Sequence, residues 1–431
     1  MLETLKEELK NNHVFLTGGG GVGKSYLTYE LIRHYRAQGH SVVVLGSTGI
    51  SAVHVNGQTA HSFFAFGIAN DSETMLRNDK YNKHRLKELR EILERCELLI
   101  LDEISMVSAS VMEMIRYRLD QLNFAGRLLF VGDFFQLPPV SKRTTNSNSL
   151  FGDPLYAFES TAWEVFSPKM LVLNQPKRTS NPHFFHVLGR VREGDSSAEV
   201  LEYLSALSGN THAWEKDPTV LFGRNAEADA MNKIKLRELD APLVALPSKE
   251  TLHDISLHVK RLEGWKKNLP VQEIMELKVG ARVLFCTNKW GKYMNGEHGI
   301  VREIEEDAIW VEKNGALVEV ERHEFVLNEP HMSGGDIQEK PMASVLQFPL
   351  KLAYAITIHK SQGMSIDTLV CDIDHIFESS QFYVAISRAK EPGDLLLRYT
   401  RGDLRTHVER CIRVDERVRA FYATNPSVRL D

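Results

Sequence analysis

The sequence has few cysteines and no long apolar run. Its four cysteines lie far apart in the 431 residues and form no Cys-x-x-Cys pair: Cys96, Cys286, Cys371 and Cys411. This spacing argues against a disulfide framework and against a zinc site, and it favours a reducing cytosol. No apolar run approaches the ~20 residues of a membrane span, and the charged stretch Met1–Lys10 is untypical of a signal peptide. We therefore expect a cytoplasmic protein with no membrane partner.

The sequence also lacks an excess of charge of one sign, an internal repeat and a low-complexity segment. With 52 lysines and arginines against 57 aspartates and glutamates, the net charge is −5, which does not by itself indicate nucleic acid. Nucleic acid is not excluded either, because a motor needs only a local basic channel. The length exceeds that of one ordinary hydrophobic core, so two or three domains are expected.

A glycine-rich stretch, Gly18-Gly-Gly-Gly-Val-Gly-Lys24-Ser25, has the spacing of a phosphate-binding loop. It follows an apolar strand pattern at His13–Thr17 and precedes a helical pattern at Tyr26–Gln38, which is the context such a loop needs. A glycine-rich turn alone could be only a tight loop, but the Lys-Ser pair favours a nucleotide. Glycines let backbone N–H groups cradle phosphates at a helix N-terminus. The residues expected to hold the nucleotide are Gly18, Gly20, Gly21, Val22, Gly23, Lys24, Ser25 and Tyr26.

Two carboxylates, Asp102 and Glu103, directly follow a later apolar strand pattern at Leu98–Leu101. Adjacent acids are common on surfaces, but Asp102 and Glu103 come where an α/β sheet exposes its ligand site. We expect Lys24 to reach the β- and γ-phosphates, Ser25 and Asp102 to bind Mg²⁺, and Glu103 to deprotonate the attacking water.

The third motif is Gly132–Pro139, which follows a strand pattern at Arg127–Val131. Gln136 is placed to sense a γ-phosphate by hydrogen bonding. Taken alone, this motif could be a structural turn.

Alternating strand and helix patterns predict an α/β fold with parallel sheets. The first domain is expected over 1–165, with a small wedge or pin insertion at about 63–84. The second domain is expected over 166–250 and 343–431, and it begins with a strand pattern at 169–173. Short β-type runs separated by Asn-Gly turns indicate a small barrel inserted over 251–342.

The return from the predicted barrel to the second domain has a specific expected course. The stretch His331–Pro341, rich in glycine and proline, is predicted to be a linker. A strand at Ala343–Phe348 and a helix at Ala353–Gln362 are expected to follow it.

Six motifs occur in a fixed order along the chain. They are Gly18–Ser25, Ser47–Ala52 with Thr59–Phe64, Asp102–Ser105, Gly132–Pro139, Ala355–Gly363 and Phe382–Arg388. This series resembles that of superfamily-one DNA helicases of the PIF and RecD-like group. The resemblance implies two RecA-like P-loop domains with ATP and Mg²⁺ between them and single-stranded DNA across their top. It also implies that the inserted unit is an SH3-like barrel that holds the strand or the pin against which the duplex breaks.

The resemblance also assigns roles to residues. Arg178 and Arg388 would act as arginine fingers that stabilise charge on the transferred phosphoryl group, although each could instead be a surface cation. Gly363 would contact the nucleotide. The DNA backbone would be contacted by Thr48, Gly49, His61 and Ser62 in the first domain and by Thr357, His359 and Ser361 in the second.

Three phenylalanines follow the first set of DNA contacts: Phe63, Phe64 and Phe66. One or two of them, Phe63 first, could stack on bases or form part of a wedge. Plain core packing is an equally open alternative.

The function expected from these motifs is that of a monomeric, ATP-dependent 5′-to-3′ DNA helicase acting on single-stranded DNA and on single-strand/duplex junctions. A phosphate-loop switch or kinase would account for Gly18–Ser25 and Asp102, but not for the later motifs. A RecD-like subunit of a larger repair complex would share every motif and need partners. A superfamily-one RNA helicase would differ in its nucleic-acid preference.

Overall fold

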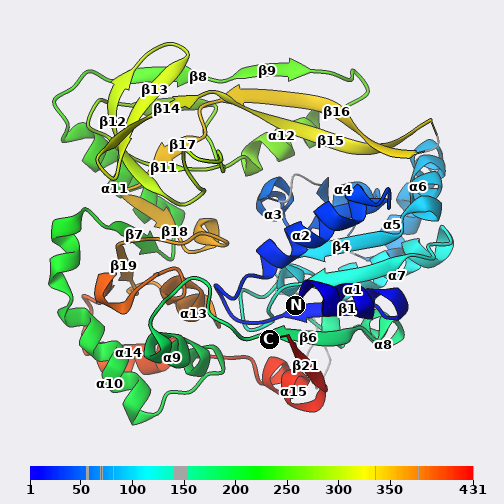
Figure 1. Ribbon diagram of the computed structural model, residues 1–431, viewed down its shortest axis with the longest axis horizontal. Helices are drawn as coiled ribbons and strands as arrows, with labels where there is room; N and C mark the ends of the chain where they lie inside the picture. Colours follow the sequence, from blue (N-terminus) through cyan, green and yellow to red (C-terminus); the bar gives the residue numbers. More distant parts are fainter. Residues whose placement is uncertain are drawn as a thin grey trace. The chain divides into compact units, whose positions relative to one another are not determined.

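The computed structural model describes residues 1–54, 58–67, 69, 71–80, 82–139, 154–334, 336–376 and 378–430. It consists of two compact units, each formed by segments that are distant in the sequence (Figure 1). Unit 1 comprises Met1–Gln175, Leu327–Met342 and Asp415–Asp431, and unit 2 comprises Pro176–Val326 and Ala343–Val414.

Unit 1 is built on a seven-stranded sheet in the order β21-β6-β1-β5-β4-β2-β3, in which every neighbouring pair is parallel. The inner strands are apolar along nearly their whole length because a parallel sheet is buried on both faces. Its strands are β1 (Val14–Thr17), β2 (Val42–Gly46), β3 (Gln58–Thr59), β4 (Leu98–Asp102), β5 (Arg127–Val131), β6 (Lys169–Leu173) and β21 (Ser427–Leu430).

The longer helices of unit 1 alternate with these strands, as the sequence pattern predicts. Side-chain caps mark where several of them begin: the Ser108 hydroxyl accepts the Val111 N–H, and Asp71 accepts the Thr74 N–H. The helices are α1 (Leu2–Asn11), α2 (Lys24–Ala37), α3 (Gly49–His54), α4 (Ala60–Phe63), α5 (Ser72–Asp79), α6 (Lys83–Arg95), α7 (Ala109–Gln121), α8 (Thr161–Phe166) and α15 (Glu416–Thr424). Among the described residues, no helix combines the length and the apolar character needed to cross a bilayer.

Unit 2 contains a second parallel sheet, in the order β18-β7-β19-β20. Its strands are β7 (Thr219–Phe222), β18 (Ala355–Thr357), β19 (Leu369–Asp372) and β20 (Leu395–Arg398). The helices of this unit are α9 (Pro182–Arg192), α10 (Ala198–Ala206), α11 (Asn225–Arg237), α12 (Val259–Asn268), α13 (Gln381–Ile386) and α14 (Leu404–Cys411). Unit 2 therefore repeats the α/β design of unit 1 with a smaller sheet.

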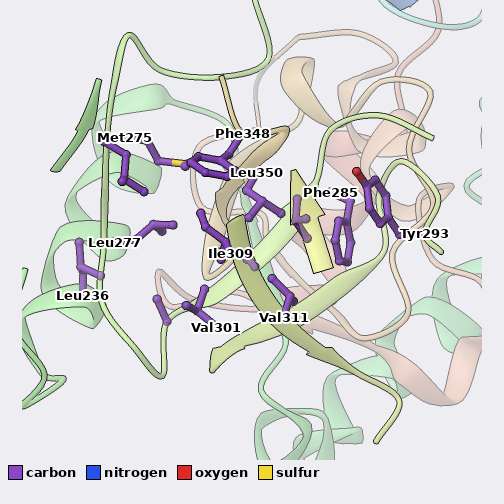
Figure 2. Close-up of a cluster of buried hydrophobic side chains, with 14 residues drawn as sticks. Leu236, Met275, Leu277, Phe285, Tyr293, Val301, Ile309, Val311, Phe348 and Leu350 are labelled. Atoms are coloured by element: carbon purple, nitrogen blue, oxygen red, sulfur yellow. The ribbon is translucent and has the colours of Figure 1, made fainter. Parts of the chain in front are cut away.

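A separate antiparallel region of unit 2 has its own hydrophobic core, in the order β14-β13-β12-β11-β17. Figure 2 shows this core, where Val301, Ile309 and Val311 lie among buried side chains from the other strands. The Phe285 and Tyr293 rings stack there with centroids 4.3 Å apart. The strands are β11 (Arg282–Phe285), β12 (His298–Ile304), β13 (Ala308–Lys313), β14 (Ala316–Glu321) and β17 (Leu350–Leu352), next to the pair β8 (Val244–Pro247) and β10 (Ile274–Leu277). That this region is an SH3-like barrel stays a prediction.

The predicted linker at 331–341 is instead the end of two long neighbouring strands. These are β15 (His323–Ser333) and β16 (Asp336–Gln347), and β16 also pairs with β9 (Lys249–Leu252). Gly334, with φ +61°, lies in the turn that follows β15. Gly334 therefore marks a turn rather than a linker.

The predicted helix at Ala353–Gln362 is wrong. Ala355–Thr357 is the strand β18, and His359–Ser361 forms a single 3₁₀ turn. A short apolar run does not distinguish a strand from a buried helix by its periodicity, and the β-branched Ile356 and Thr357 suit a strand paired with β7.

The compact units also differ from the expected domain boundaries. The strand β6, expected to open the second domain, pairs with β1 inside unit 1, and β21 near the end of the chain pairs with β6. Residues 327–342, expected in the inserted barrel, group with unit 1 as well. An apolar run predicts a buried strand, but it does not say which sheet receives it.

Candidate functional site

The glycine-rich loop connects β1 to α2, and the backbone of its glycines explains the composition. Gly23 is the N-cap of α2 with φ +94°, a conformation that L side chains rarely adopt. At Gly18, where φ is +145°, a Cβ atom would lie 2.3 Å from the Leu173 carbonyl oxygen. The loop is therefore pressed against the end of β6, and only glycine fits there.

Lys24 lies at the start of α2, and its side chain folds back over the loop. Its Nζ donates to the Gly18 carbonyl oxygen at 2.6 Å and to the Gly19 carbonyl oxygen at 3.0 Å. Ser25 and Tyr26 are exposed, whereas Val22 is buried. The loop thus presents a cation and a hydroxyl at a helix N-terminus, where backbone N–H groups favour anions.

Asp102 is the last residue of β4, and Glu103 follows it in a strained turn. Glu103 has φ +55° and ψ +49°, which is costly for a residue with a side chain, and its N–H donates to Asp102 Oδ1 at 2.9 Å. Burial and the neighbouring Glu103 raise the pKa of Asp102 to about 7, against the opposing effect of Lys24. A half-buried carboxylate pair of this kind gains free energy when a cation binds, so the donor set fits Mg²⁺.

The turn after β5 lies directly against the turn after β4. A Cβ atom at Gly132 would lie 2.9 Å from the Ile104 backbone nitrogen. Gln136 is buried in this turn, and its N–H donates to the Asp133 carbonyl oxygen at 2.8 Å. The carboxyl ends of β1, β4 and β5 therefore bring the three predicted phosphate motifs to one edge of the sheet.

The predicted DNA contacts of unit 1 lie at the same edge, after β2 and β3. The Thr48 hydroxyl accepts the Ser51 N–H at 3.2 Å, and Gly49 begins α3. His61 and Ser62 lie on α4, where burial lowers the pKa of His61 and the Ser62 N–H donates to Thr59 at 3.2 Å. The Thr48 hydroxyl thus has a structural partner already.

The aromatic cluster after these residues packs in the core. Phe63, Phe64 and Phe66 are each fully buried, and the Phe64 and Phe66 rings stack with centroids 5.5 Å apart. Arg118, which is also fully buried, donates to the Phe64 carbonyl oxygen and pairs with Asp79 at 2.8 Å. The base-stacking hypothesis for Phe63 is therefore wrong for this structure, because a ring without exposed surface cannot stack on a base.

In unit 2, the predicted DNA contacts lie at the end of β18 and just after it. Thr357 and Ser361 are buried, and the Ser361 hydroxyl donates to the Ile358 carbonyl oxygen at 2.8 Å. His359 is partly exposed, and Gly363 is exposed with φ +78°. Of these four residues, His359 and Gly363 carry exposed surface, whereas the Ser361 N–H already donates to the Ile358 carbonyl oxygen at 3.2 Å.

The structure brings Arg178 and Arg388 together in unit 2. Arg178 donates to Ser365 Oγ at 2.8 Å and to the Ser387 carbonyl oxygen, whereas Arg388 donates to the Val384 carbonyl oxygen at 2.9 Å. Burial and the positive charge of Arg388 lower the pKa of Arg178. Two guanidinium groups at close range form a place where an anion is stabilised.

Comparisons with known proteins fit this arrangement. Residues 3–200 match the PIF1-like helicase family. The ATP-dependent DNA helicase Pif1 of Campylobacter jejuni is 42% identical over 98% of this chain and 97% of its own length. This chain belongs to the PIF1-like helicase family.

Solved structures of PIF1-like helicases have the same fold. Bacteroides sp. Pif1 in complex with ADP-AlF4 has a TM-score of 0.84 and 26% identity, covering 98% of this chain and 95% of that one. Bacteroides Pif1 bound to ssDNA has a TM-score of 0.64 at 26% identity, with the same coverage of both chains. The two parallel sheets of this PIF1-like helicase are therefore those of two RecA-like P-loop domains.

Two polar side chains near these motifs were not predicted from the sequence. Ser365 holds Arg178 and lies just after the motif Ala355–Gly363, so a longer motif window would have included it. Tyr422 lies against the turn after β5 but is 288 residues beyond Phe134 in the chain. No local pattern marks it.

Proposed function

We propose that this chain is a motor that translocates in the 5′-to-3′ direction on single-stranded DNA and unwinds the duplex ahead of it. As a PIF1-like helicase it is an ATP-dependent DNA helicase, and the direction and the residue roles are the content of the proposal. The observation that carries it is the meeting of Lys24, the Asp102–Glu103 pair and Gln136 at the carboxyl ends of adjacent parallel strands.

In the proposed nucleotide site, Lys24 neutralises the β- and γ-phosphates, and Ser25 and Asp102 hold Mg²⁺. The metal, when bound, neutralises charge on the phosphate oxygens. Glu103 orients and deprotonates the attacking water. Its strained backbone sets the direction in which its side chain leaves the main chain. The side-chain amide of Gln136 donates a hydrogen bond to the γ-phosphate when that phosphate is present.

In the second RecA-like domain, Arg178 and Arg388 are the proposed arginine fingers, and Gly363 is a nucleotide contact. The support is their proximity, because a bound phosphate offsets both the burial and the repulsion from Arg388 that lower the pKa of Arg178. Their present hydrogen bonds are to carbonyl and hydroxyl oxygens, which a charged phosphate replaces favourably.

Single-stranded DNA is proposed to lie on the residues that follow the strand ends. These are Thr48, Gly49, His61, Ser62, Thr357, His359 and Ser361. Hydroxyl, imidazole and backbone N–H donors bind phosphates without reading sequence, which suits a motor that must pass over any base.

The antiparallel region of unit 2 is proposed to hold the strand as an SH3-like subdomain. Its loop Thr287–Asn295 is well fixed, since Lys289 pairs with Glu321 and the Asn295 N–H donates to Asn288 Oδ1 at 2.7 Å. A Cβ atom at the next residue, Gly296, would lie 3.0 Å from the Ser365 carbonyl oxygen, so the base of the loop lies beside the proposed DNA residues. Trp290, in this loop, is fully exposed and offers a ring on which a base can stack.

We further propose that unit 1 is the first RecA-like domain and that unit 2 is the second one with the inserted subdomain. The chain is proposed to act as a monomer. It is also proposed to lie in the cytosol, which is supported by its four free cysteines. Mass measurement of the purified chain, together with unwinding by the chain alone, separates this proposal from a subunit of a larger repair complex.

The experiment that tests the proposed function compares duplexes that carry a single-stranded tail on one strand only. Unwinding from a 5′ tail with ATP, and none from a 3′ tail, is the expected result. Replacing the DNA tail with RNA of the same sequence distinguishes a DNA helicase from an RNA helicase.

A further inference from the structure

Tyr422, on α15 near the end of the chain, places its hydroxyl between two of the phosphate motifs. The hydroxyl oxygen lies 2.9 Å from Thr17 Oγ1 and accepts the Phe134 N–H at 3.1 Å. The same hydroxyl donates to Asp133 Oδ1 at 3.4 Å. These contacts suit a hydroxyl group, which offers one donor and two acceptor sites.

The aromatic ring of Tyr422 is held independently of its hydroxyl. It stacks on Phe135 with ring centroids 4.7 Å apart and an interplanar angle of 12°. Phe421, the preceding residue, packs edge-on against Phe134 at 5.4 Å. The ring contacts therefore position α15 even when the hydroxyl is removed.

The hydroxyl contacts Thr17 and Asp133, the residues at which two of the proposed functional loops begin. Thr17 directly precedes Gly18, the first glycine of the phosphate loop, and it is fully buried. Asp133, also fully buried, begins the turn in which its own carbonyl oxygen accepts the Gln136 N–H. A shift at Tyr422 therefore reaches both the phosphate loop and Gln136.

The C-terminal segment that carries Tyr422 is anchored in unit 1 at both of its ends. At its start, Arg417 pairs with Glu159 at 3.2 Å, and the Tyr156 hydroxyl donates to Asp415 at 3.3 Å. At its end, β21 pairs with β6, the strand against which Gly18 is pressed. The position of Tyr422 is thus fixed by the fold rather than by its own contacts alone.

We propose that Tyr422 is a positioning residue for ATP hydrolysis, which sets the distance between the phosphate loop and the turn that carries Gln136. It rests on the proposed function of those two motifs. Tyr422 acts through Thr17 and Phe134 rather than on the nucleotide, so its loss misplaces reacting groups without removing one. The buried Phe134 N–H also loses its hydroxyl acceptor.

The test is the variant Tyr422→Phe, which keeps the ring and removes the hydroxyl. We expect the kcat of DNA-stimulated ATP hydrolysis to fall about tenfold, with the KM for ATP and the Kd for single-stranded DNA within about twofold of wild type. The matched control is Tyr156→Phe, which removes another hydroxyl, one that donates to Asp415 at the start of the C-terminal segment. Its kcat is expected to match wild type.

Three outcomes would overturn the proposal. The first is a Tyr422→Phe kcat within twofold of wild type, and the second is an equal loss in Tyr156→Phe. The third is a loss of activity that a lower Tm or a lower folded fraction accounts for, which would make the role of Tyr422 merely structural. If Lys24→Ala also retained turnover, the function proposed for the phosphate loop itself would fail, and that failure is separate.

Discussion

The proposed phosphate and metal contacts Lys24 and Ser25 of unit 1 have exposed surface, whereas the proposed phosphate contacts Arg388 and Ser361 of unit 2 are enclosed by protein. Ser25 is exposed and Lys24 is partly exposed, but Arg388 is only 2% exposed and Ser361 is fully buried. Both units nevertheless hold their cations in the same way, on backbone carbonyl oxygens. On the proposed roles, the cations of both units exchange carbonyl oxygens for a phosphate, and in unit 2 this exchange takes place at a buried guanidinium.

The largest expected effect concerns Lys24, in the proposed nucleotide site of unit 1. Lys24→Ala removes the charge aimed at the phosphates, and ATP turnover should fall below detection while the Tm stays within a few degrees of wild type. Steady-state hydrolysis and thermal unfolding measure the two quantities. Turnover near that of wild type would show that the loop does not bind the reacting phosphates.

A second variant tests Arg388, the buried arginine of unit 2. Arg388→Ala should lower the kcat of ATP hydrolysis by about 10³ if the guanidinium reaches the transferred phosphoryl group. Arg388→Lys should recover little, because an ammonium lacks the planar pair of donors. Arg405→Ala, at an exposed arginine of the same unit, is the control. A defect confined to DNA affinity would remove Arg388 from the finger role.

The raised pKa of Asp102 predicts a pH dependence of nucleotide binding in unit 1. Mg²⁺ needs the ionised carboxylate, so the affinity for Mg²⁺-nucleotide should weaken by roughly tenfold from about pH 8 to about pH 6. Without metal, the raised folded-state pKa means that this group's contribution to the free energy of unfolding falls as pH rises from about 4 to about 7. Titration calorimetry at several pH values measures the affinity. Asp102→Asn should bind weakly at every pH, and an unchanged pH profile in that variant would assign the dependence to another group.

The smallest expected effect concerns the exposed loop of unit 2. Trp290→Ala should weaken binding of single-stranded DNA about fivefold at fixed salt, through loss of one stacked base, and leave basal ATP hydrolysis unchanged. Trp290→Phe should retain most of the affinity. Fluorescence anisotropy of a labelled oligonucleotide measures this. Equal affinity of wild type and Trp290→Ala would remove the loop from the DNA path, and a change in molecular mass would indicate instead that Trp290 contacts a second copy of the chain.

The sequence predicted the strands and turns around Lys24 and Asp102 better than those around Thr357 and Ser361, for physical reasons. The strands β1, β4 and β5 are buried on both faces, so each reads as a continuous apolar run followed by polar residues at the sheet edge. Gly18, Gly23 and Gly132 are required by backbone conformation or close approach, and such glycines recur at fixed positions in a motif.

The local sequence pattern does not show which side chains are buried together or which distant strands pair. The local sequence around Phe63 does not show that Arg118, a fully buried residue of α7, holds the aromatic cluster in the core through the Phe64 carbonyl oxygen. The strand β18 was predicted as a helix because its three-residue length gives no usable period. The pairing of β21 with β6, and with it the place of Tyr422, depends on contacts between residues more than 250 positions apart.

The measurement that tests the central claim most directly is the unwinding of tailed duplexes by the purified chain with ATP. A duplex with only a 5′ single-stranded tail should be unwound, and the same duplex with only a 3′ tail should stay intact. Lys24→Ala should unwind neither. Unwinding from the 3′ tail alone, or from neither tail by a chain that hydrolyses ATP with DNA, would contradict the account of this chain as a 5′-to-3′ DNA motor.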